Sequence, residues 1–146
     1  AGLLVWLLAN IEINDICILK HLSDFLDPLA VIFGLDGIIL SAFILGIAAN
    51  ETVIPIMLMG YLSVGTPVEF ASLMQFKELL LSNGWTVTTA ICTIIFALFH
   101  WPCATTLMTI KKETGSIKHT LLSAIMPTLF GLVLCFAIAT ISKILK

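Results

Sequence analysis

The chain has 146 residues, of which 60% are hydrophobic and 11% are charged, and its formal net charge is −2. Soluble domains carry about 25% charged and about 45–50% apolar residues, so a water-soluble fold of this length could not cover so many apolar side chains. All seven basic residues are lysines, which argues against nucleic acid as a partner because phosphate recognition needs clustered Lys and Arg. We therefore expect membrane lipid to surround the chain.

Two stretches precede the first long apolar run. Residues 1–9 are apolar and lack the basic region of a signal peptide, so we interpret them as the end of a transmembrane helix that begins outside this sequence. On this interpretation the chain is the C-terminal part of a longer membrane domain. In residues 10–30, apolar side chains from Ile16 to Leu29 recur every three or four positions among acidic and basic ones. This pattern predicts an amphipathic helix at the membrane surface.

Residues 35–64 form an apolar run that is longer than the roughly 20 residues a membrane-spanning helix needs. Asn50 and Glu51 interrupt the run, and Pro55 follows shortly after. The segment is either a broken helix or a re-entrant hairpin with Asn50 and Glu51 near its tip, and the sequence leaves both open. Asp36, at the start of the run, is expected to cap the N-terminus of the helix that follows.

A second amphipathic stretch covers residues 67–83 and is followed by the apolar segment 85–110. His100-Trp101-Pro102-Cys103 interrupts this segment. Because proline removes a backbone donor and clashes with the preceding turn, the helix should kink or unwind near Leu98 and Phe99.

The last part of the chain is predicted to be a short basic loop at 111–118 and a transmembrane helix at 120–142. The expected fold class is thus all-α, a polytopic transmembrane helical bundle with broken or re-entrant helices and amphipathic interfacial helices. The two interrupted segments share one plan, in which a polar break separates two apolar halves. Interrupted hydrophobic segments at corresponding positions point to a transporter binding site.

Glu51 is the residue of greatest functional interest, since it lies near the middle of its apolar run. A carboxylate at the bilayer centre costs at least ~2.5 kcal/mol unless a cation, a proton or water compensates it. Asn50 adds an amide oxygen, and unwound backbone around it would add carbonyl oxygens. The alternative is a structural carboxylate, paired with a helix N-terminus or with a lysine elsewhere.

His100 and Cys103 stand three residues apart, a spacing that lets both side chains face one cavity. Imidazole and thiolate together bind first-row metals that are softer than magnesium or calcium. The alternative is a hydrogen-bonded histidine beside an inert cysteine. The other cysteines (Cys17, Cys92 and Cys135) are expected to behave as small apolar side chains, and Gly46, Gly60 and Gly131 to allow close helix contacts.

Several motifs in this sequence resemble the membrane domain of the ferrous iron transport protein B (FeoB) family. They are Gly34-Leu35-Asp36-Gly37, Ala49-Asn50-Glu51-Thr52-Val53-Ile54-Pro55, His100-Trp101-Pro102-Cys103-Ala104-Thr105-Thr106 and Thr109-Ile110-Lys111-Lys112-Glu113-Thr114-Gly115-Ser116. The resemblance covers nearly the whole chain and corresponds to the second of two Gate-type regions. It implies Fe²⁺ as transported substrate, with Cys103, Glu51, Asn50 and His100 as its ligands.

The resemblance also implies a multi-pass protein of the prokaryotic inner membrane. The expected partners are an N-terminal GTP-binding domain, the first half of the membrane domain and a small FeoA-like regulatory protein, and a homo-oligomer is compatible with them. Any GTP or Mg²⁺ chemistry would belong to that domain, so this chain is not expected to be an enzyme. Two alternatives stay open: a cation-coupled, nucleoside-transporter-like carrier of a small polar solute, and a non-transporting membrane assembly subunit.

Overall fold

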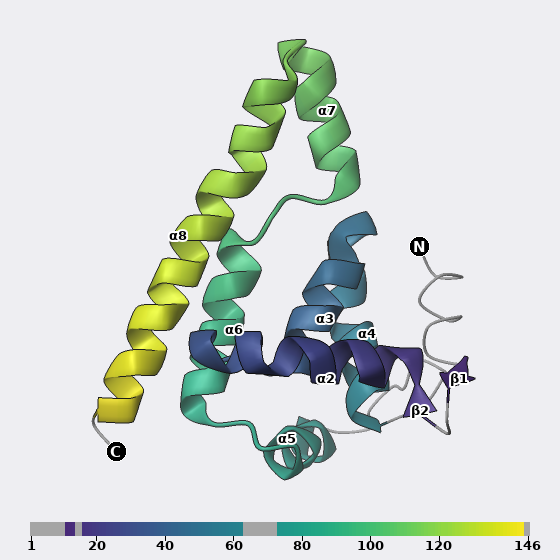
Figure 1. Cartoon of the computed structure of the whole chain (residues 1–146), viewed down its shortest axis with the longest axis vertical. Coiled ribbons are helices and arrows are strands. Elements are labelled where there is room, and N and C mark those ends of the chain that lie inside the picture. The colour runs from purple at the N-terminus through teal and green to yellow at the C-terminus, as the bar shows by residue number, and fades with distance from the viewer. Residues whose placement is uncertain (1–10, 14–15, 63–72, 145–146) are drawn as a thin grey trace.

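The computed structural model describes residues 11–13, 16–62 and 73–144, and it is almost entirely helical (Figure 1). The helices are α2 (Ile18–Ala30), α3 (Gly37–Leu45), α4 (Val53–Leu62), α5 (Leu73–Ser82), α6 (Val87–Phe99), α7 (Ala104–Thr114) and α8 (Ile117–Ile144), with short 3-10 turns η1 (Val31–Phe33), η2 (Gly46–Ala48) and η3 (Asn50–Thr52). The predicted all-α class is confirmed. The helix end predicted at 1–9, and part of the stretch predicted at 67–83, lie outside the described residues.

The helix predicted over 10–30 begins only at Ile18. Before it, β1 (Glu12–Ile13) and β2 (Ile16–Cys17) pair as a minimal antiparallel hairpin. Phe25 and Leu29, on the predicted apolar stripe of α2, are 77% and 51% exposed, as expected of a face directed at lipid. On its other side the helix buries Leu19, Ser23 and Ala30, a narrow face whose small residues let the helix approach α3 closely.

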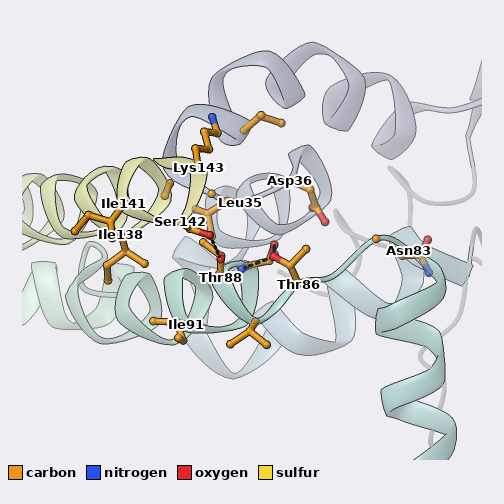
Figure 2. Close-up of a pocket in the computed structure, with 16 residues that line it drawn as sticks. Leu35, Asp36, Asn83, Thr86, Thr88, Ile91, Ile138, Ile141, Ser142 and Lys143 are labelled. Atoms are coloured by element: carbon orange, nitrogen blue, oxygen red, sulfur yellow. Dashed lines mark hydrogen bonds between the residues drawn. The ribbon is translucent and has the colours of Figure 1, made fainter. Parts of the chain in front are cut away.

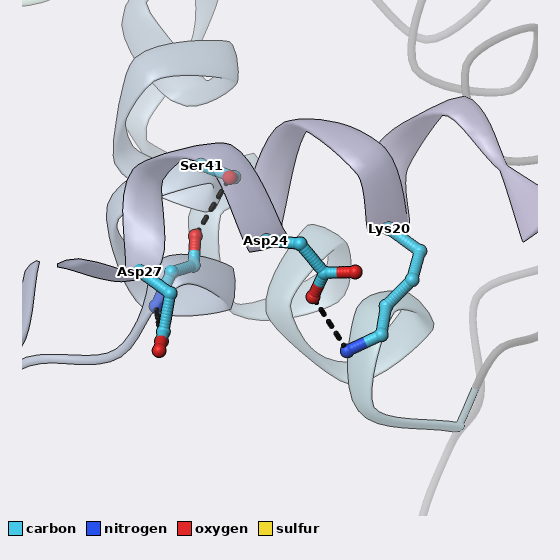
Figure 3. A network of polar contacts seen from close by, with 5 residues as sticks. Lys20, Asp24, Asp27 and Ser41 are labelled. Atoms are coloured by element: carbon cyan, nitrogen blue, oxygen red, sulfur yellow. Dashed lines mark hydrogen bonds and ion pairs between the residues drawn. The ribbon is translucent and has the colours of Figure 1, made fainter.

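The corner between α2 and α3 is sharp, with 106° between the two helical arms. Gly34 makes the turn in the left-handed region, at φ 71°, a conformation that glycine adopts without penalty. Asp36 caps α3 by accepting a 2.7 Å hydrogen bond from the Ile39 amide, so the predicted cap is confirmed. Asp27 reaches across from α2 and accepts the Gly37 amide at 3.0 Å (Figure 3), which satisfies a second free donor at the start of α3.

Helices α3 and α4 form an antiparallel hairpin, which decides between the two forms left open for residues 35–64. Gly60 packs on Ile38. The Tyr61 hydroxyl, near the end of α4, donates a hydrogen bond to Asp36, at the start of α3. The arms have nine and ten residues, or about 14–15 Å at 1.5 Å per residue. That length is about half of a 30 Å hydrocarbon core, so the segment has the dimensions of a re-entrant hairpin whose tip is η2–η3.

The second apolar segment breaks where the proline predicted. Helix α6 ends at Phe99, residues 100–103 are non-helical, and α7 begins at Ala104. Unlike the first break, this break does not reverse the direction of the chain. Residues 87–114 together are long and apolar enough to form one membrane-spanning segment. The two interrupted segments therefore differ in shape, although their sequences follow one plan.

Within the described residues, two helical segments are long and apolar enough to cross a membrane, and a third is obtained if the bent α2–α3 pair counts as one span. These two are 87–114 and α8, which lie side by side (Figure 1). Cys92 and Cys135 are fully buried between α6 and α8, as predicted, and each thiol donates to the backbone carbonyl of the other residue at 3.7 and 3.3 Å. Gly131 allows the close approach of Phe99.

The basic loop predicted at 111–118 is wrong, because α7 continues through Thr114 and only Gly115 and Ser116 connect it to α8. Gly115 ends α7 in the left-handed conformation, a common C-terminal cap. Lys111 and Lys112 lie in the last turn, where positive charge interacts favourably with the helix dipole. The lysines thus stabilise a helix end and do not mark a loop.

Candidate functional site

The two polar breaks lie next to each other in space. Phe43, near the end of α3, contacts both the Phe96 and the His100 rings, with centroids 4.9 and 5.0 Å apart. Helix α7, which starts directly after the second break, lies against η2 at the hairpin tip. The structure thus brings the neighbourhood of Asn50 and Glu51 close to that of His100 and Cys103, although 50 positions separate them in sequence.

His100 has a defined tautomer. Its Nδ1 lies 2.8 Å from the Ala97 carbonyl oxygen, and a carbonyl only accepts, so Nδ1 must carry the proton. In the neutral ring Nε2 then bears a lone pair. That nitrogen is buried and has no hydrogen-bond partner among the described residues. Metal-binding histidines commonly donate the other ring nitrogen to a backbone carbonyl in this way.

Trp101 presents a second unsatisfied nitrogen beside the first. Its Nε1 is also buried without a partner in the described part of the chain, and its ring lies 6.2 Å from His100 and 5.9 Å from Phe96. A buried polar group without a partner carries a penalty of about 1–3 kcal/mol. The break therefore holds one free acceptor and one free donor that water, an ion or a polar solute could satisfy.

Cys103 occupies the N-cap position of α7 and is partly exposed. Its Sγ lies 3.0 Å from Thr105 Oγ1 and 3.2 Å from Thr106 Oγ1. Hydroxyl donors and the start of a helix both favour negative charge on sulfur. This cysteine differs in that respect from Cys92 and Cys135, which are fully buried.

Asn50 and Glu51 lie in η3 at the hairpin tip, and both are exposed. Neither side chain has a hydrogen bond or an ion pair within the described ranges, but Glu51 lies in the first turn of η3, which runs directly into α4. The helix N-terminus considered as a structural partner for its carboxylate is therefore present. Thr52 holds the local turn by donating to the Ala49 carbonyl at 2.7 Å. The tip thus offers amide and carboxylate oxygens that are free to bind a cation.

No three His, Cys, Asp or Glu side chains among residues 11–13, 16–62 and 73–144 converge as a metal-binding group. The four predicted ligands occupy two adjoining breaks and do not form a closed cage. Their role as metal ligands stays a prediction.

A hydrogen-bond chain at the other end of the hairpin was not foreseen. Trp85 Nε1 donates to the Tyr61 hydroxyl at 2.7 Å, and Tyr61 donates to Asp36. These hydrogen bonds join the start of α3 and the end of α4 to Trp85. Trp85 directly precedes Thr86, which caps the N-terminus of α6. Tyr61 is the only tyrosine of the chain, and a buried tyrosine hydroxyl generally needs a partner. This need for a partner is the one sign of the hydrogen-bond chain in the sequence, and it does not identify the partner.

Comparison with known protein families yields a match over most of the chain. Residues 1–117 match a family model named Gate and described as nucleoside recognition. No curated protein and no solved structure matches the chain. The matched residues include the α3–α4 hairpin, both polar breaks and all of α7.

Proposed function

The chain belongs to the Gate family of transporter-like membrane proteins, and from this premise we propose that it forms part of a permeation path for Fe²⁺. The family occurs both in FeoB-type iron transporters and in nucleoside transporters. The observation that carries the choice of iron is the lone pair of His100 Nε2, which is buried and unpartnered at a helix break. Imidazole nitrogen is a favourable ligand for Fe²⁺ and a poor one for Mg²⁺ or Ca²⁺.

In the proposed path the ion exchanges ligands between the two breaks. Glu51 and Asn50, exposed at the tip, supply oxygen ligands, and the Glu51 carboxylate offsets part of the cation's charge. His100 and Cys103 supply nitrogen and sulfur at the adjoining break. Ligands distributed over two places suit conduction, because the ion must bind strongly enough to enter and weakly enough to leave.

The substrate is tested by flux into liposomes that contain the complete protein to which this chain belongs. We expect uptake of Fe²⁺ under reducing conditions, with Mg²⁺ and nucleosides taken up no faster than by protein-free liposomes. Uptake of a nucleoside without Fe²⁺ would contradict the iron proposal. Absence of flux for all three substrates, with correctly inserted protein, would instead favour an assembly subunit.

A nucleoside-transporter-like carrier is the second candidate, and two observations favour it. The family model is described as nucleoside recognition, and the consecutive residues His100 and Trp101 contribute one unpartnered acceptor, Nε2, and one unpartnered donor, Nε1, groups that a base or sugar hydroxyl can satisfy. Trp101→Phe removes the donor and keeps a smaller aromatic ring. It should abolish nucleoside flux if this candidate is correct and leave Fe²⁺ flux within about twofold of the unmodified protein if iron is the substrate.

A further inference from the structure

A cavity of about 820 Å³ lies at the end of α6 remote from the two breaks. It is bounded by the first turn of α6, the last turns of α8 and the corner at Gly34–Asp36 (Figure 2). Leu35, Ile91, Ile138 and Ile141 form its apolar wall, and Thr88, Ser142 and Lys143 contribute polar groups. It shares no residue with the proposed iron path.

The polar side of the cavity has unused hydrogen-bond donors. Thr88 Oγ1 and Ser142 Oγ lie 2.6 Å apart, and their bond uses one of two hydroxyl protons, so one remains for a ligand. Thr86 and Thr89 form a similar pair at 3.0 Å, with the Thr86 oxygen also accepting the Thr89 amide. A ligand with several acceptor oxygens would complete both pairs.

The cavity lining contains one cationic and one acidic side chain, and only the cationic one is free for a ligand. Lys143 lines it and has no ion pair among the residues that the structure describes. The acidic residue of the lining, Asp36, uses both carboxylate oxygens, one for the Ile39 amide and one for the Tyr61 hydroxyl. The cavity therefore offers a free ammonium group and free hydroxyls against a carboxylate that is already satisfied, a combination suited to phosphate.

The apolar side of the cavity selects an amphipathic ligand. Candidate spans begin at residue 87 and end at residue 144 beside this cavity, which is the level at which lipid headgroups lie if both segments cross the membrane. Ile91 and Ile141 are 42% and 56% exposed, so the wall is continuous with the outer surface of the spans. A free phosphate would leave this wall unused.

We propose that the cavity binds an anionic phospholipid, with its phosphate at Lys143 and the hydroxyl pairs and an acyl chain along the isoleucine wall. A zwitterionic lipid carries a cationic amine beside its phosphate, and Lys143 would repel that amine. The site is independent of which substrate the protein transports.

The test measures lipid selectivity of the complete protein in nanodiscs of phosphatidylcholine with increasing phosphatidylglycerol, by native mass spectrometry of retained lipid. Loss of a lysine contact should lower the preference for phosphatidylglycerol about fivefold in Lys143→Gln. Lys143→Arg should retain the preference. Lys118→Gln, in the first turn of the same helix and outside the cavity, serves as the matched control and should also retain it.

A second variant tests the apolar wall without changing charge. Ile91→Trp should reduce retained phosphatidylglycerol because the larger ring fills the space of the acyl chain, and excess inorganic phosphate should displace little lipid from the unmodified protein. Unchanged selectivity in Lys143→Gln, or unchanged retention of phosphatidylglycerol in Ile91→Trp, would overturn the proposal. Efficient displacement by inorganic phosphate would overturn it as well, because the site would then recognise the anion alone.

Discussion

Fe²⁺ flux is expected to fall at least about tenfold when Cys103 is replaced by serine and when Glu51 is replaced by glutamine. One change removes the thiolate and the other the carboxylate charge of a proposed metal ligand, and both keep nearly the same side-chain volume. Loss of groups that merely orient metal ligands already costs about 10–100-fold in affinity or activity, so loss of a ligand should cost no less. The measurement is Fe²⁺ uptake into liposomes, normalised to the amount of correctly folded protein.

Two matched controls accompany these variants. Cys92→Ala removes a thiol that is fully buried between α6 and α8, and Glu113→Gln removes an exposed carboxylate near the end of α7. Both should keep uptake within about twofold of the unmodified protein. If Cys103→Ser and Glu51→Gln also transport Fe²⁺ at the unmodified rate, the assignment of ligands is wrong.

Gly37→Ala is expected to destabilise the fold by about 3 kcal/mol or more, the upper end of the range for overpacked sites. A Cβ at this position would overlap the backbone carbonyl of Ser23, which cannot rotate away as a side chain could. The added methyl group would force α2 off α3 and weaken the Asp27 hydrogen bond to the Gly37 amide. Denaturant or thermal unfolding in detergent, followed by circular dichroism, measures the loss.

Gly115→Ala is the control for the intrinsic effect of replacing glycine. Nothing lies within 4 Å of a Cβ there, but the backbone has φ 63°, so the change should cost only about 1–2 kcal/mol for the left-handed conformation. Equal destabilisation by the two variants would show that α2 and α3 are not packed as closely as described.

The features predicted correctly from sequence are those determined by local chemistry. Pro102 cannot continue a helix, and α6 ends at Phe99. Asp36 precedes the apolar run and caps α3. Gly46, Gly60 and Gly131 each lie where a Cβ would meet a neighbouring side chain. In each case the residue type restricts the backbone or the contact distance directly.

The features that sequence could not predict depend on contacts between distant segments. Periodicity predicted an amphipathic α2, but it could not show that the helix packs on α3 through Ser23 and leaves Phe25 exposed. Lysine density suggested a loop where α7 continues. Within the candidate site, the polar breaks were predictable, but their proximity depends on how Phe43 meets His100, and the His100 tautomer depends on the Ala97 carbonyl.

Labelling of cysteines in the complete protein tests whether water and Fe²⁺ reach the second break. A membrane-impermeant thiol reagent, applied from either side of proteoliposomes to variants that retain a single cysteine, should modify Cys103 and leave Cys92 and Cys135 unmodified. Fe²⁺ under anaerobic conditions should slow the reaction of Cys103 at least about tenfold. A Cys103 that stays unmodified from both sides, or that reacts equally fast with and without Fe²⁺, would rule out an Fe²⁺ path at the second break.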